Sequence, residues 1–555
     1  MLMTPAKIGR LMRTVLHLKP GQIINRVSRR VLRARDVRGP TPAIREAEQV
    51  FTPCPGRPAS MIGPLSFLFL GEKGALGEPA DWNSPGKAKL WLYNLHYFDD
   101  LLADGAPSRA DWHRSLISNW IAANPPLAGN GWEPYVLSRR SVNWIGWHLA
   151  GNLLGPDALA SLAMQARALS GLLEYHLLGN HLFANAKALV FLGAFFEGAE
   201  ADRWLQTGVS ILERELKEQI LGDGGHFELS PMYHALTLED LIDLVQLARI
   251  YPERLSGAAT RQRWSERARA MLDWLAVMSH PDGEISLFND AALGQTRTHA
   301  ELSSYYAAAS VNAAPPAEAA QRSRHLKASG HARLQRGSWV VLMDMAEVGP
   351  SYLPGHAHAD TLSLEISLAG QRLITNGGTS VYAMGPHRDI ERGTASHATV
   401  CIDGENSSET WASFRVGRRA RVLGAQVSLG ADRDTAEASH DGYRHLKGSP
   451  LLHREVSVGA ETVLICDRCE ARSPHDVTGR LPLHPSVRSV TLGGNGWDIV
   501  TRDGRTVRVV LSGPVEPGVE DGFFAGSFGV RTPRPVLTWT ARGVRSLTVE
   551  VEFSL

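Results

Sequence analysis

The stretch Thr361-Leu-Ser-Leu-Glu-Ile-Ser-Leu368 decides the fold of the second half of this chain. Every second residue in it is apolar, and the polar residues between them are serine and glutamate. This period of two predicts a β-strand with one buried face. The same alternation returns near the C-terminus at Leu547, Val549, Val551 and Phe553. Short strand-like runs separated by glycine-containing turns fill the interval, so we predict an antiparallel β-sandwich from about residue 331 onward.

The pattern before this region is helical. From about residue 85 to 310 apolar residues recur at the spacing of one helix face, as in Leu238, Leu241, Ile242 and Val245. Loops rich in Gly, Asn and Pro separate the runs. An alanine-rich stretch at 307–330, with Pro315-Pro316, indicates a linker.

Helices followed by strands predict two domains with a cleft between them. We expect a helical domain at 85–325 and an antiparallel β-sandwich at 326–555. Residues 1–84 are expected to form a basic N-terminal segment that packs on this body.

The composition is that of an ordinary globular protein and gives no indication of nucleic-acid binding. The 555 residues are 43% hydrophobic and 21% charged, as in ordinary globular proteins. The 58 basic and 57 acidic side chains give a net charge of +1, which offers no global reason to bind nucleic acid. We therefore expect no nucleic-acid partner, and affinity for a polyanion requires a local patch. The sequence leaves the oligomeric state open.

The basic N-terminal segment bears on localisation. It shows no apolar core of the kind a secretory signal needs, and the chain has no run of about 18 to 20 apolar residues. The expectation is a cytoplasmic protein, with a periplasmic or exported location left open. A basic helix at Ile8 to Arg33 on a membrane surface is an alternative. Its apolar positions also suit docking onto the body, so we expect docking and no membrane association.

Two histidines immediately precede the strand that decides the fold, in Gly355-His-Ala-His-Ala-Asp360. If this segment is already extended, His356 and His358 project to one side and Asp360 continues that face. His397, in Ala395-Ser-His-Ala-Thr399, is a candidate third imidazole. Neutral imidazoles are common zinc ligands. The alternative for any single histidine is a structural role in the core.

The helical half contributes two polar segments at helix borders. They are Gly179-Asn-His181 and Ser230-Pro-Met-Tyr-His234. Loops at such borders often carry function on a rigid scaffold. The structural alternatives are a helix cap for Asn180 and a core aromatic for Tyr233.

These segments, with Asn376-Gly-Gly-Thr-Ser-Val-Tyr382 and Arg392-Gly-Thr-Ala-Ser-His-Ala-Thr-Val400, together resemble the heparinase II/III family of polysaccharide lyases. The likeness covers roughly residues 90 to 480. It implies an incomplete (α/α) toroid followed by an antiparallel β-sandwich, with an anionic uronic-acid polymer bound between them. The implied reaction is β-elimination, which removes the C5 proton of a uronate and expels the glycosidic oxygen at C4. The start of the chain, with Leu18-Lys-Pro20, is similar to bacterial members associated with surface polysaccharides.

The resemblance implies a role for each matching residue. Asn180 and His181 would stabilise the charge that builds on the uronate carboxylate. Tyr233 and His356 match the acid and base, in an order that depends on the substrate. His358 and His397 match ligands of a structural metal, usually zinc. The third metal position departs from the pattern, because Asn376 stands where such relatives have an aspartate and an amide is a poorer zinc ligand.

Other side chains are candidates for substrate binding. Arg388 and Arg392 could grip carboxylates, with surface solvation as the alternative. His234 lies beside Tyr233 and is a further candidate. Trp132, with Trp144 and Trp147, could stack on sugars, although helix packing suits each of them as well.

Two other functions stay open at this point. A glycoside hydrolase on a helical toroid would use a carboxylate pair such as Asp223 and Glu228, but it leaves Asn180, Tyr233 and His356 without a use. A non-catalytic polysaccharide-binding or export-accessory protein is the third reading.

Overall fold

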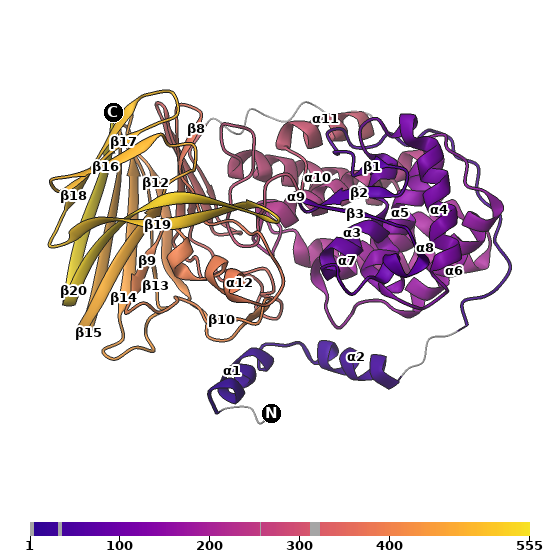
Figure 1. Ribbon diagram of the computed structural model, residues 1–555, viewed down its shortest axis with the longest axis horizontal. Helices are drawn as coiled ribbons and strands as arrows, with labels where there is room; N and C mark the ends of the chain where they lie inside the picture. The colour runs from indigo at the N-terminus through magenta and orange to yellow at the C-terminus, as the bar shows by residue number, and fades with distance from the viewer. Residues whose placement is uncertain (1–4, 32–35, 256, 311–321) are drawn as a thin grey trace.

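The computed structural model describes residues 5–31, 36–255, 257–310 and 322–555. A helical body and a body of β-sheets lie side by side, and the first two helices run along one flank (Figure 1). The fold is an incomplete (α/α) toroid followed by an antiparallel β-sandwich. The change of period predicted helices followed by a sandwich and the family resemblance implied the toroid, so the expected fold class is confirmed. Most of the expected linker, residues 311–321, lies outside the described residues.

Nine α-helices build the described part of the toroid. They are α3 (Lys89–Tyr97), α4 (Ala110–Ala123), α5 (Pro134–Leu149), α6 (Pro156–Gly171), α7 (Gly179–Phe195), α8 (Ala199–Gln219), α9 (Pro231–Ile250), α10 (Ala258–Met278) and α11 (His299–Ala309). Helices α5, α7 and α9 are buried on nearly every side, whereas α8 buries one stripe. Because α7 packs against α5, α8 and α9, the toroid has an inner and an outer layer of helices.

Residues 36–84 pack on this helical body. They include a three-stranded sheet of β1 (Met61–Gly63), β2 (Ser66–Phe69) and β3 (Glu72–Ala75). Phe51, Phe67 and Phe69 are buried in the same apolar core as the toroid helices. This part of the N-terminal segment therefore belongs to the helical domain.

The sandwich contains two antiparallel sheets. The smaller sheet joins β4 (Arg324–Leu326), β5 (His331–Arg336), β6 (Trp339–Asp344), β7 (Leu364–Leu368) and β8 (Gln371–Ile374) in that order. The larger sheet has ten strands in the order β12-β13-β14-β15-β20-β18-β17-β16, with β9 beside β15 and β19 beside β20. Its strands are β9 (Val400–Ile402), β12 (Val422–Leu429), β13 (Asp434–His440), β14 (Leu451–Val458), β15 (Thr462–Pro482), β16 (Ser489–Gly493), β17 (Gly496–Val500), β18 (Thr506–Ser512), β19 (Glu516–Ser527) and β20 (Val530–Ser554).

Short elements complete this domain around the junction. They are the helix α12 (Pro386–Glu391) and a two-stranded sheet of β10 (Thr410–Trp411) and β11 (Arg415–Val416). Apolar side chains from both large sheets form one core, which includes Leu364, Ile366, Val463 and Val551.

Strand β7 shows how the two domains are fixed to each other. Its apolar side chains enter the sandwich core, and its polar face is also buried, because it meets the end of α10. There, His280 bonds to Ser367 Oγ and Glu365 Oε2, each at 2.7 Å. An apolar cluster that includes Trp274, Phe288 and Leu342 spans the same junction. The loop that follows α10 is thereby held against the sandwich.

The first two helices, α1 (Pro5–Val15) and α2 (Pro20–Val31), contact the body through polar side chains. Arg10 and Arg13 pair with Glu409, and Thr14 accepts a hydrogen bond from Trp411 Nε1 at 3.2 Å. Lys19 pairs with Glu218 on α8. Docking was expected through apolar positions, but of these only Leu11 and Leu18 are half-buried, and the other described apolar side chains of the segment are exposed. No helix in the described ranges is long and apolar enough to cross a membrane.

Candidate active site

The segment that carries His356 and His358 is a loop, which corrects the expectation of an extended strand mouth. Strand β7 begins only at Leu364, and Leu362 has a φ of 61° in the turn before it. The two imidazoles therefore do not share one open face. His358 is fully buried, whereas the side chain of His356 keeps 15% of its surface exposed.

Both imidazoles contact one carboxylate that the sequence analysis missed. Asp290 Oδ2 lies 3.0 Å from His356 Nδ1, and its Oδ1 lies 2.9 Å from His358 Nε2. Arg388 donates to both oxygens, with 2.7 Å from its NH2 group to Oδ2. Asp290 sits in the loop after α10, far from these partners in sequence, and only the pairing of the domains reveals it.

The charge of Asp290 is well compensated. Burial opposes ionisation, but Arg388 and hydrogen bonds from the two histidines outweigh it and hold the pKa of Asp290 well below its usual range. An ionised Asp290 can only accept a hydrogen bond, so His356 Nδ1 carries the hydrogen and donates it. The outer nitrogen of His356, Nε2, is then the atom of a neutral ring that carries a lone pair.

Tyr233, at the start of α9, stacks on His356. The ring centroids are 3.8 Å apart with 29° between the planes. The Tyr233 hydroxyl lies 3.0 Å from the hydroxyl of a second tyrosine, Tyr382, at the end of the Asn376–Tyr382 segment. Burial, followed by the neighbouring Tyr382 and Asp290, raises the pKa of Tyr233 well above its usual value. Tyr233 is therefore a neutral hydroxyl that can donate a proton.

The start of α7 forms the opposite side of the site. Asn180 and His181 are half-buried there, in the first turn, where backbone N–H groups favour anions. Burial would lower the pKa of His181, but Glu174, 3.2 Å from its Nδ1, raises it overall. The side-chain amide of Asn180 has no hydrogen-bond partner among the described residues, so it can bind a ligand.

Glu228 links this side to His356. Its Oε1 accepts from the Asn180 N–H at 3.2 Å, and its Oε2 lies 3.7 Å from His356 Nε2. Burial raises the pKa of Glu228. Gly179 allows the close approach, because a Cβ there would lie 2.5 Å from Glu228 Oε1 and 2.3 Å from Leu353. Glu228 thus stands in this site, whereas Asp223 bonds to Ser329 and is not its partner.

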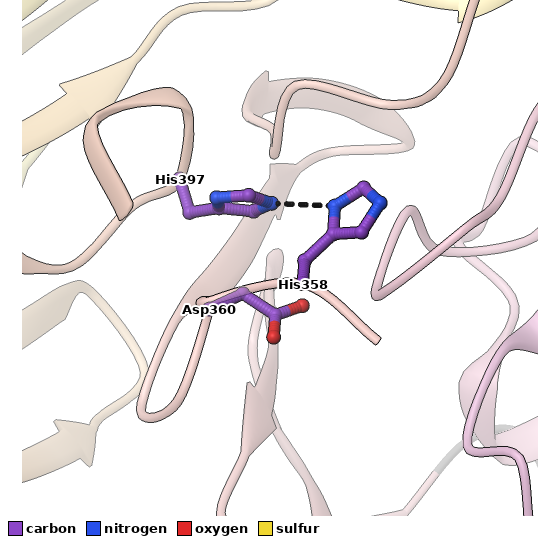
Figure 2. A group of neighbouring side chains, drawn as sticks. All are labelled: His358, Asp360 and His397. Carbon is purple, nitrogen blue, oxygen red and sulfur yellow. Dashed lines mark hydrogen bonds between the residues drawn. The ribbon is translucent and has the colours of Figure 1, made fainter. Parts of the chain in front are cut away.

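His358 and His397 face each other with Nδ1 and Nε2 3.1 Å apart (Figure 2). The remaining nitrogen of each ring is engaged, in His358 by Asp290 and in His397 by the Gly393 carbonyl at 2.8 Å. If the engaged nitrogens, His358 Nε2 and His397 Nδ1, carry the hydrogens, then His358 Nδ1 and His397 Nε2 each have a lone pair. Both lone pairs are directed at the space between the two rings. Asp360 completes a group whose ligand atoms all lie within 4.8 Å of one another.

Asn376 does not complete this group as expected. Its Oδ1 accepts from the Ala398 N–H at 3.1 Å, and its Nδ2 has no partner among the described residues. An amide nitrogen carries hydrogens and is not a metal ligand. The donor set that fits a cation is therefore His358, His397 and Asp360.

The two arginines expected to bind substrate are structural. Arg388 is fully buried, and its guanidinium is used by Asp290 and by the Ser413 carbonyl. Arg392 is also buried and donates to the Ala357 carbonyl at 2.8 and 3.0 Å. Both residues hold the loops around the site.

Two other expected contacts lie inside the helical core. His234 is fully buried, stacks on Trp274 and bonds to the Met271 carbonyl at 2.9 Å. Trp132 is buried, packs against Trp120 and donates to the Asn124 carbonyl at 3.2 Å. Trp144 and Trp147 are buried too. Neither His234 nor Trp132 reaches the site. Tyr135, which the sequence analysis did not single out, packs on His181 with 4.6 Å between the ring centroids.

The helical toroid, the β-sandwich and the tyrosine–histidine pair at their junction agree with the family that the sequence matches. The sequence matches the heparinase II/III N-terminus over residues 148–314 and the heparinase II/III-like C-terminal domain over 318–553. The chain belongs to the heparinase II/III-like family.

The chain is similar to proteins whose names indicate different functions. The chain is 27% identical over 389 residues to a heparin-sulfate lyase of Bacteroides stercoris, covering 60% of this chain and 57% of that protein. It is 29% identical over 407 residues to the FtsZ-localized protein C of Caulobacter vibrioides, covering 67% and 63%. The chain thus spans about three fifths of the length of these relatives.

A crystal structure of heparinase III has the same fold. It superposes with a TM-score of 0.69 at 18% identity, covering 87% of this chain and 79% of that one. Because the chain is similar to relatives with such different names, the activity has to be argued from the site itself.

Proposed function

We propose that this protein is a polysaccharide lyase that cleaves an anionic, uronic-acid-containing polymer by β-elimination. The observation that carries the proposal is the stacked pair of Tyr233 and His356, partly exposed at the domain junction and backed by buried Asp290. It sets a proton donor beside a proton acceptor, which elimination requires.

His356 is the proposed base. Asp290 takes the hydrogen bond from Nδ1–H, so the lone pair is on Nε2, which we propose receives the C5 proton. Glu228 Oε2 lies 3.7 Å from this nitrogen, beyond hydrogen-bond distance. The electron pair of the broken C5–H bond forms the C4–C5 double bond. Asp290 also stabilises the imidazolium that results.

Tyr233 is the proposed acid. As the C4–O bond breaks, its hydroxyl gives a proton to the leaving glycosidic oxygen. The neighbouring Tyr382 hydroxyl, 3.0 Å away, can donate a hydrogen bond to the tyrosinate formed. Proton exchange with solvent then returns both side chains to their starting states.

Asn180 and His181 are proposed to hold the uronate carboxylate. Charge accumulates on this carboxylate while C5 loses its proton, so donors aimed at it lower the barrier. The raised pKa of His181 favours its cationic form, and the first turn of α7 adds backbone dipoles.

A panel of polysaccharides tests this function. The purified protein is incubated with heparan-like, alginate-like and bacterial exopolysaccharide uronates, and ultraviolet absorbance of the unsaturated product is followed. We expect absorbance to rise with at least one polymer. Chain shortening without absorbance contradicts the lyase proposal in favour of a hydrolase. Binding without shortening favours a non-catalytic polysaccharide-binding protein.

We further propose that His358, His397 and Asp360 can hold a zinc ion in a structural role. Zinc prefers such nitrogen and carboxylate donors, and partners on the outer ring nitrogens orient the histidines as in known metal sites. When bound, the ion would fix the loop that carries His356.

Metal analysis checks this proposal. We expect about one zinc per chain, lost in His397→Ala together with several degrees of thermal stability. Wild-type protein that lacks stoichiometric metal after purification with added zinc would reject the site.

A further inference from the structure

We propose that the helices α1 and α2 form a membrane-surface anchor that binds an anionic lipid bilayer in its interfacial plane. In an ordinary surface helix the apolar stripe faces the protein core. Here the orientation is reversed. Apolar side chains of this pair are exposed to solvent, namely Ile8, Met12, Val15, Leu16, Ile23, Ile24 and Val27.

Exposed apolar residues recur along both helices. Ile8, Met12 and Val15 recur at the spacing of one face of α1, and Ile24 and Val27 follow on α2. Leu16 is 83% exposed and Ile24 is 66% exposed. Exposing several apolar side chains to water is unfavourable, and on a protein surface a group of them indicates a binding face.

The polar side of the pair faces the body. Lys19 pairs with Glu218 on α8, and Arg13 binds Glu409 through two nitrogens. These contacts orient the helices with their apolar residues outward. Both helices lie on one flank of the molecule, alongside the body (Figure 1).

Charge identifies the occupant of this face. Residues 1–35 contain no Asp or Glu and nine basic residues, which are Lys7, Arg10, Arg13, Lys19, Arg26, Arg29, Arg30, Arg33 and Arg35. The whole chain has a net charge of only +1. Arg10, Arg13 and Lys19 pair with glutamates of the body, and Arg26 is exposed on α2. Exposed apolar residues within a uniformly basic segment are typical of helices that lie in the headgroup layer of anionic membranes. This combination fits lipid better than a protein groove, which would not need a uniformly basic segment.

Vesicle sedimentation of the full chain tests the anchor. Phosphatidylcholine vesicles are prepared with and without phosphatidylglycerol. We expect the protein to sediment with the anionic vesicles and to be released by salt. The double variant Leu16→Glu/Ile24→Glu is expected to weaken binding by at least about tenfold, because charge replaces buried apolar surface.

Leu153→Glu is the matched control, since Leu153 is as exposed but lies between α5 and α6. It should bind vesicles like wild type. Failure of wild type to sediment with anionic vesicles would overturn the proposal, as would equal binding by the double variant. If the double variant instead converts a lipid-free oligomer to monomer, the face binds a second copy of the chain and the proposal is wrong.

Discussion

Tyr233→Phe is expected to lower kcat by about 100- to 10,000-fold, the usual contribution of a positioned acid. The change removes the hydroxyl that protonates the leaving oxygen and keeps the ring that stacks on His356. Substrate KM should change little. The rate of appearance of unsaturated product and a thermal melt of the same sample measure the two effects.

Tyr251→Phe is the control for this substitution. The Tyr251 hydroxyl is buried on the far end of α9 and has no partner among the described residues. Its loss should leave kcat unchanged. Near-normal turnover by Tyr233→Phe would remove Tyr233 from the mechanism.

Asp290→Asn should damage both stability and turnover. It leaves the buried Arg388 without its counter-ion, which costs about 3–5 kcal/mol in the free energy of unfolding. His356 also loses the carboxylate that fixes its Nδ1 proton. A misplaced base is expected to reduce kcat of the folded enzyme on the order of 100-fold, with a smaller effect on KM.

Asp467→Asn separates the two effects. Asp467 pairs with Arg454 at 2.7 and 2.8 Å, equally buried, inside the sandwich. It should destabilise the protein to a similar degree, with kcat of the folded enzyme preserved. If Asp290→Asn and Asp467→Asn reduce kcat equally, Asp290 has only a structural role.

The fold was predictable because its signals are local. The alternation at Thr361–Leu368 predicts a strand, and the spacing of Leu238 to Val245 predicts a helix. Sequence could not show that Glu365 and Ser367 are buried, because their partner His280 belongs to the other domain. A polar face on a strand normally meets water, and here it meets a second domain.

The site was only partly predictable for the same reason. Tyr233 and His356 stood out by motif, and the structure stacks them. Asp290 has no motif of its own, and its role depends on side chains 66 to 98 residues away. Arg388 suited a substrate carboxylate by charge alone, but burial shows that its carboxylate is Asp290. Burial of this kind follows from packing between domains and not from local spacing.

The reversed amphipathicity of α1 and α2 was equally hidden. The sequence shows apolar and basic residues in helical order but does not say which side meets the body. Contacts from Arg10, Arg13 and Lys19 decide it.

Mass spectrometry of the products tests the central claim most directly. A defined oligosaccharide of the polymer that gives absorbance is cleaved, and the masses of its two fragments are added. Elimination adds no water, so the account predicts that the sum equals the substrate mass and that the uronate fragment is unsaturated. A sum greater by one water molecule would show hydrolysis and contradict the account.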